Sequence, residues 1–142
     1  MPCISAQFDP KIGPLIGFGV ALPGTLVSGG NLVGRFYTGL LDSGASGTCI
    51  SAQIVSDVGL SPVGKTAITT ASHAKISANT YLVDVAVALF DPGQGQVTAW
   101  VVQNVQVTEF TAPKQFQVLV GRNFLCNGLF MMSPDNRFTL CM

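Results

Sequence analysis

Glycine and proline divide this chain into short apolar segments, and no other sequence feature limits the fold as strongly. Sixteen Gly and eight Pro are spread over 142 residues. The runs between them are long enough for strands and too short for long helices. None approaches the ~20 apolar residues of a membrane-spanning helix, so we expect no membrane partner. The pattern is typical of an all-β fold made of short strands and turns.

The segment from Tyr81 to Phe90 carries the clearest strand pattern, because its apolar residues alternate with period two. The residues expected on one face are Tyr81, Val83, Val85, Val87 and Leu89. Other strands are expected over residues 15–22, 36–41, 65–70, 97–107, 129–132 and 137–141. The last two form a hairpin, and the whole set predicts a closed or sandwiched all-β domain.

Only two minor helices are expected. Ser51 is a suitable N-cap for a helix that stops at Gly59. A second helix of one or two turns is expected over residues 123–127. It ends at Gly128, whose missing Cβ suits a left-handed cap.

The composition fits one domain spanning residues 1–142 and excludes nucleic acid as a partner. A chain of this length buries a sizeable single core. Its seven basic and seven acidic side chains leave no basic stripe for binding nucleic acid. Charged residues make up only 10% of the chain, against about 25% in an average domain. Burial of part of this weakly charged surface in an oligomer is therefore expected.

The cysteines and the first residues bear on metal binding and on location. Cys3, Cys49, Cys126 and Cys141 are widely spaced, without the close pairs of zinc and redox motifs. We therefore expect four small, mostly buried thiols and no metal site. Residues 1–5 lack the basic and long apolar regions of a secretory signal, which favours a cytoplasmic location.

Two familiar catalytic patterns are incomplete, and one candidate remains. Residues 44–48 approach the Gly-x-Ser-x-Gly nucleophile elbow, but Thr48 replaces the second Gly. His73 is the only histidine, and the sequence offers it no evident partner. The remaining candidate is Asp42, which follows an apolar strand and opens a loop of small residues. Since an Asp that starts a turn is common, the tripeptide Asp-Ser-Gly alone is a weak signal.

A second segment, about eighty residues later, strengthens the signal. Residues 116–125 read as an apolar strand, then Gly121, then Arg122 and Asn123 opening a short helix. Together with Asp42-Ser43-Gly44-Ala45-Ser46, this segment resembles the retropepsins, the retroviral-type aspartic proteases. In that family an Ile/Leu-Ile/Val-Gly-Arg-Asn/Asp-x-Leu segment packs under an Asp-Thr/Ser-Gly-Ala loop. The resemblance runs from about Leu15 to the C-terminus.

The resemblance implies a retropepsin-like acid protease fold, a closed barrel-like half of a pepsin, with one lobe per chain and no cofactor. Peptide hydrolysis by this family requires two carboxylates that share one proton. Because this chain has a single such motif, the second Asp42 must come from another copy, at the axis of a homodimer. Asp42 is then the catalytic residue of an endopeptidase that cleaves extended peptides between apolar residues.

The same resemblance assigns supporting roles around Asp42. Ser43 braces the partner loop across the dimer axis, and the Gly44 carbonyl lies near bound substrate. Ala45 stands where pepsin-like relatives usually carry a hydroxyl, which implies an activity profile less acid-shifted than pepsin's. The structural support under the site is assigned to Gly121, Arg122 and Asn123.

Residues 69–75 correspond to the flap of the family, a β-hairpin that closes over substrate and excludes water. Its tip residues are Thr70, Ala71, Ser72, His73 and Ala74. Their mostly small side chains suit a mobile tip, and His73 is unusual there. Without the resemblance, the same stretch reads equally well as a plain surface hairpin.

The chain departs from the viral members at two places. Ser46 occupies the position of an Asp that usually pairs with the helix Arg, so Arg122 needs another acceptor or the dimer is held differently. Viral members also share their terminal strands in one dimer sheet. Residues 137–142 suit that role, whereas residues 1–14 form a longer extension that wraps the partner, is disordered or marks a maturation cut.

Two other functions stay open at this point. One is a retropepsin-like fold that binds peptides or assembles without catalysis. The other is a β-rich structural subunit in which Asp-Ser-Gly occurs by chance, which fits the low charge and the many glycines. The two paired segments favour the enzyme, because the structural reading leaves residues 118–125 as an accident.

Overall fold

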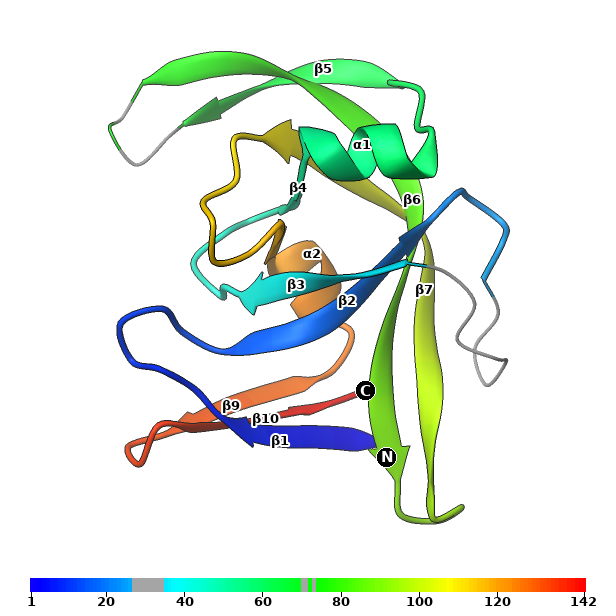
Figure 1. Cartoon of the computed structure of the whole chain (residues 1–142), viewed down its shortest axis with the longest axis vertical. Helices are drawn as coiled ribbons and strands as arrows, with labels where there is room; N and C mark the ends of the chain where they lie inside the picture. Colours follow the sequence, from blue (N-terminus) through cyan, green and yellow to red (C-terminus); the bar gives the residue numbers. More distant parts are fainter. Residues whose placement is uncertain (27–34, 70–71, 73) are drawn as a thin grey trace.

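The computed structural model describes residues 1–26, 35–69, 72 and 74–142. These described residues form ten strands and two short helices along the chain (Figure 1). They are β1 (Cys3–Gln7), β2 (Leu15–Ala21), β3 (Arg35–Leu41), β4 (Thr48–Ser51), α1 (Ala52–Val58), β5 (Gly64–Thr69), β6 (Lys75–Asp91), β7 (Gln96–Phe110), β8 (Val118–Val120), α2 (Arg122–Leu125), β9 (Leu129–Ser133) and β10 (Arg137–Cys141). The all-β expectation with two minor helices is confirmed.

Six of the strands close into a barrel. Each pairs with two others in the order β2, β3, β8, β4, β7 and β6, and β6 pairs back with β2. The barrel interior is filled by aromatic and branched side chains that are fully buried, such as Phe18, Ile50, Val118 and Phe124. The Phe18 and Phe124 rings meet edge to face with centroids 5.1 Å apart, so α2 is fixed against the barrel core.

The longest strands, β6 and β7, form a ribbon that the sequence located only in part. The period-two residues of β6 from Tyr81 to Leu89 are all buried, as expected. The strand nevertheless begins at Lys75, because the polar stretch before Tyr81 pairs with β5. At the irregularity between Val83 and Val85, the buried Asp84 carboxylate accepts hydrogen bonds from three backbone N–H groups, those of Thr25, Leu26 and Asn104.

Both helices lie where the sequence placed them, but one cap differs. The Ser51 hydroxyl accepts a hydrogen bond from the Ile54 N–H, and Gly59 ends α1 in the left-handed conformation. The expected left-handed cap at Gly128 is wrong, since its φ is not positive. A Cβ at Gly128 would lie 2.1 Å from the Cys141 carbonyl oxygen. Close packing, and not backbone conformation, therefore requires glycine there.

The strands β1, β10 and β9 form a three-stranded extension of the sheet, named here the terminal sheet (Figure 1). β1 pairs with β10 of the same chain over its whole length. Within the expected extension of residues 1–14, residues 3–7 therefore build the chain's own sheet, and the roles expected for this extension toward a partner or in maturation stay predictions. The sequence missed β1 because its pairing partners lie 130 to 138 residues away.

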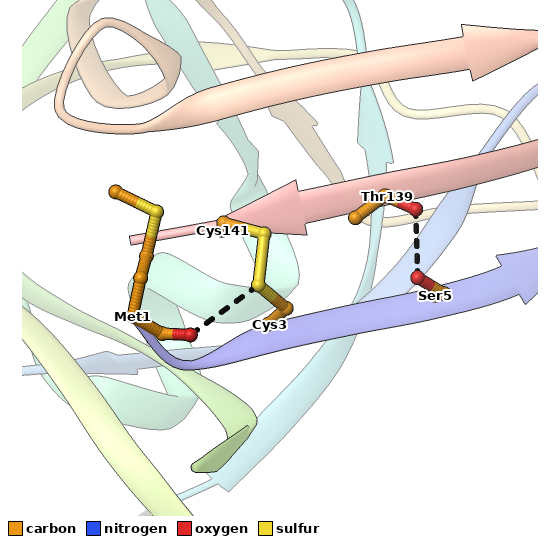
Figure 2. The surroundings of a disulfide bond; sticks show 5 residues. All are labelled: Met1, Cys3, Ser5, Thr139 and Cys141. Carbon is orange, nitrogen blue, oxygen red and sulfur yellow. Dashed lines mark hydrogen bonds between the residues drawn. A yellow bond between two sulfur atoms is a disulfide. The ribbon is translucent and has the colours of Figure 1, made fainter. Parts of the chain in front are cut away.

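A disulfide closes the terminal sheet. Cys3 and Cys141 stand opposite each other in the β1–β10 register and are bonded (Figure 2). The expectation of four mostly buried thiols is therefore wrong: two are oxidised, Cys49 is half-buried and Cys126 is exposed. Disulfides persist mainly in oxidising compartments and are rare in the cytosol. The bond therefore argues against the expected cytoplasmic location, which stays a prediction.

The described ranges contain neither a membrane-spanning helix nor a metal-binding cluster. None of the helices there is both long enough and apolar enough to cross a membrane. Likewise, no three His, Cys, Asp or Glu side chains in those ranges gather in a way that would hold a metal ion.

Candidate functional site

The loop after β3 holds Asp42 in one defined orientation. Its Oδ1 atom accepts a hydrogen bond of 2.8 Å from the Gly44 N–H, and its backbone N–H donates to the Val120 carbonyl of β8. A Cβ at Gly44 would lie 3.0 Å from the same carboxylate oxygen, so this position favours glycine. Asp42 is half-buried, and Ser43 and Gly44 beside it are exposed. The carboxylate is thus fixed from within the chain while it stays accessible.

Arg122, the first residue of α2, binds the Asp42 loop through its side chain and its backbone. One terminal nitrogen of its guanidinium donates to the Ser43 carbonyl at 3.0 Å and to the Gly44 carbonyl at 3.2 Å. Its backbone N–H donates to the Ala45 carbonyl. The acceptors that replace the acidic partner of viral relatives are therefore backbone carbonyls of the loop itself. A hydrogen bond to a charged donor is stronger than a neutral one, so these contacts restrain the loop.

A second set of contacts joins the loop to α2 through Thr48, which is buried. The Thr48 hydroxyl donates to the Asn123 side chain at 2.7 Å and accepts from the Gly121 N–H at 3.1 Å. Asn123 also donates through its amide to the Gln106 carbonyl of β7. The backbone N–H of Asn123 donates to the Ser46 carbonyl. Each end of the loop is thereby tied to the same short helix.

Gly121 lets the two segments approach closely. A Cβ on it would lie 2.3 Å from the Gly47 carbonyl oxygen, a separation that packed atoms do not adopt. A Cβ on Gly47, in contrast, has no neighbour within 4 Å. Only Gly121, and not Gly47, is therefore required to be glycine at this contact.

The structure brings together seven of the predicted site residues. The loop residues Asp42, Ser43, Gly44 and Ala45 lie against the start of α2, where the expected supports are Gly121, Arg122 and Asn123. Their catalytic and supporting roles stay predictions, because contacts describe position and not chemistry.

The expected flap falls on the hairpin of β5 and β6. Thr69 pairs with Lys75 at the outer end of this hairpin. A hairpin at this place is what the resemblance implied. Of the five predicted tip residues, Ser72 and Ala74 are exposed. Thr70, Ala71 and His73 lie outside the described residues.

A cavity of about 550 Å³ lies under this hairpin. Its walls come from the hairpin, from the β4–α1 junction and from the end of β7 with the residues just after it. Figure 1 shows where these elements lie. The lining residues are Ser51, Ala52, Gln53, Lys65, Ile76, Ser77, Ala78, Asn79, Glu109, Phe110, Thr111 and Ala112. Its mixed polar and apolar walls are compatible with an extended peptide, which offers backbone polar groups and side chains together.

Glu109 is the acidic group of this cavity. It accepts a hydrogen bond of 3.3 Å from the hydroxyl of the buried Tyr81. Burial raises the pKa of Tyr81 above its usual value, and the negative charge of Glu109 raises it further, whereas Asn79 lowers it. The tyrosine therefore stays a neutral donor to Glu109 at ordinary pH.

Sequence reasoning missed Thr48 and the cavity. Thr48 gave one signal, because a hydroxyl residue follows the small-residue loop as the first residue of β4. The cavity gave none, since its walls come from four separated segments that only the fold brings together.

Comparisons with known proteins show the family and the fold of the chain. A family model described as aspartyl protease matches residues 29–124. Among curated proteins no sequence matches. Among solved structures, the chain is similar to a retropepsin-like aspartic protease from Rickettsia conorii, with a TM-score of 0.59 and 11% identity. The match covers 97% of this chain and 89% of that one. At this identity the likeness shows the fold.

Proposed function

Because the chain belongs to the aspartyl protease family, we propose that it is an aspartic endopeptidase whose active site is shared by two copies. The observation that carries the proposal is the Asp42 loop: an accessible carboxylate whose backbone N–H binds β8 and whose neighbouring loop carbonyls bind Arg122 of α2. A single carboxylate does not suffice for this chemistry, since one group must take a proton while another gives one. The chain has one such loop, so the second is that of another copy.

In the proposed reaction the two Asp42 carboxylates hold one proton between them, because like charges about 3 Å apart do not both ionise cheaply. The ionised carboxylate takes a proton from a water as the water attacks the peptide carbon. The protonated carboxyl gives its proton to the carbonyl oxygen. Collapse of the resulting tetrahedral diol breaks the C–N bond and transfers a proton to the leaving amine.

The hairpin of β5 and β6 acts in this proposal as the cover of the substrate, and the cavity beneath it receives part of the peptide chain. Ser43 and Gly44 expose the edge of the loop to substrate and partner. The Gly44 carbonyl, expected near bound peptide, already accepts from Arg122. A carbonyl oxygen has two lone pairs, so it can accept a second hydrogen bond from a peptide N–H.

The test is a peptide-library cleavage assay from about pH 3 to about pH 8, with Asp42→Asn as the variant. We expect the variant to lose turnover by about 1,000-fold or more while it keeps the fold. A transition-state mimic such as pepstatin should inhibit the wild type.

Asp91→Asn is the matched control. Asp91 accepts through Oδ1 from the Gly93 N–H at 2.9 Å, the same local turn as Asp42 makes. Unchanged cleavage in this control ties the effect to the site. Wild-type protein that binds peptides without cutting them would instead support the non-catalytic peptide-binding module, and protein that does neither would support a structural subunit.

A further inference from the structure

The outer strand of the terminal sheet, β9, is an open and apolar edge. Among the described residues it pairs on one side only, with β10. Three of its five side chains are large, apolar and about half exposed: Leu129 at 49%, Met131 at 51% and Met132 at 59%. Edge strands are normally protected by charged residues, proline or bulges. No charged residue stands between Arg122 and Asp135, so β9 carries none.

The neighbouring strand β10 has no free edge to offer a partner. It pairs with β9 on one side and with β1 on the other, both from the same chain. The Cys3–Cys141 disulfide and the Ser5–Thr139 hydrogen bond of 2.7 Å join β1 to β10 (Figure 2). Interleaving of terminal strands between two chains, as the viral resemblance implied, would require this closed pair to open.

We propose that a second copy of this chain pairs along β9, antiparallel and edge to edge, so that two terminal sheets become one sheet of six strands. This inference rests on the proposed function, which needs a second copy to complete the site. A two-fold axis through the middle residue places Met131 opposite the Met131 of the other copy, and Leu129 opposite Ser133. Pairing satisfies the free backbone groups of β9 and covers its exposed apolar side chains.

The edge and the candidate site are held in a fixed relation by α2. The helix begins at Arg122, which binds the loop carbonyls of Ser43 and Gly44, and β9 begins four residues after the helix ends. Gly128 in that link packs directly on the Cys141 carbonyl. A partner that docks on β9 is therefore rigidly placed with respect to the Asp42 loop, as a shared active site requires.

Like charges placed at the centre of the edge test the proposal. In Met131→Lys, two ammonium groups face each other across the axis, which should raise the dimer dissociation constant at least about 100-fold. Val97→Lys is the matched control. Val97 is an apolar strand residue exposed to 60%, and it lies outside β9, near the start of β7. Sedimentation equilibrium measures the association, and circular dichroism with thermal melting checks that each variant is folded.

A charge complementation makes the test independent of any general damage. Met131→Glu alone should also dissociate, and an equal mixture of Met131→Lys and Met131→Glu should associate again, with peptidase activity following the dimer. A mixture that stays monomeric, or a Met131→Lys protein as dimeric as the control, overturns the proposal. So does a wild type that is monomeric at every concentration tested.

The failure of this inference is distinguishable from failure of the proposed function. A Met131→Lys protein that is both dimeric and active refutes the β9 contact and leaves the shared site intact. A wild type that dimerises through β9 but cleaves no more than Asp42→Asn refutes the protease and leaves the contact.

Discussion

Two turns of this molecule have the same local structure and different surroundings. In Asp42-Ser43-Gly44 and in Asp91-Pro92-Gly93, an aspartate Oδ1 accepts a hydrogen bond from the glycine N–H, at 2.8 Å and 2.9 Å. The second turn joins β6 to β7 at the end of their ribbon, and the hydrogen bonds described for Asp91 come from backbone N–H groups of the turn itself. The first lies on α2, with its carbonyls bound by Arg122. The aspartate turn is therefore ordinary, and its support distinguishes the candidate site.

The largest effect is expected from a substitution that fills the space between the Asp42 loop and α2. Gly121→Ala places a Cβ against the Gly47 carbonyl, so either the loop or α2 must move. We expect unfolding free energy to fall by about 3 kcal/mol or more, with loss of peptidase activity. Urea unfolding and the cleavage assay measure the two effects.

The control for that variant is Gly47→Ala, on the other side of the same contact. Its Cβ meets no atom within 4 Å, so stability should change by no more than about 0.5 kcal/mol. Equal damage from both substitutions would show that the close approach of the two segments is not what requires glycine.

A smaller effect is expected from the buried hydroxyl that joins loop and helix. Thr48→Val keeps the shape of the side chain but leaves the Gly121 N–H and the Asn123 side chain without this partner. The cost should be about 1–3 kcal/mol in unfolding free energy. Thr48→Ser, which retains the hydroxyl, should lose clearly less; a serine variant as unstable as the valine variant would refute the hydrogen-bond explanation.

The smallest effect concerns the two free thiols, which report on the compactness of the support. Burial raises the pKa of Cys49 in β4, so at a given pH less of it is the reactive thiolate. Cys126, just after α2, is exposed. Alkylation with iodoacetamide near pH 8 should therefore modify Cys126 before Cys49.

Mass spectrometry of timed samples gives the order of modification. Preferential labelling of Cys49 in the native protein would mean that β4 opens readily. In Gly121→Ala the protection of Cys49 should be reduced, which links this measurement to the largest effect.

Sequence patterns predicted those parts of the fold whose signals are local. The alternation in β6, the hairpin of β9 and β10 and the Ser51 and Gly59 caps each depend on residues within a few positions. The paired motifs also located Asp42 and its support. The resemblance indicates that these two short segments pack together, although they are far apart in the sequence. Local physics alone left Asp42 as one turn among several.

What the sequence did not predict depends on distant partners. β1 is a strand because it pairs with β10. Cys3 forms a disulfide because the register of this pair places it opposite Cys141. The four-residue β4 mixes polar and apolar residues, and it exists between β7 and β8. The acceptors of Arg122 are backbone carbonyls. Since every residue has a backbone carbonyl, the sequence does not indicate which ones accept.

The bond between Cys3 and Cys141 also makes the polypeptide nearly a ring. The Met142 N–H donates to the Pro2 carbonyl, and the two ends lie close together beside β6 (Figure 1). A short peptide bridge would therefore suffice to cyclise the backbone, and a tag or a fused protein attached at either end would emerge from the same place.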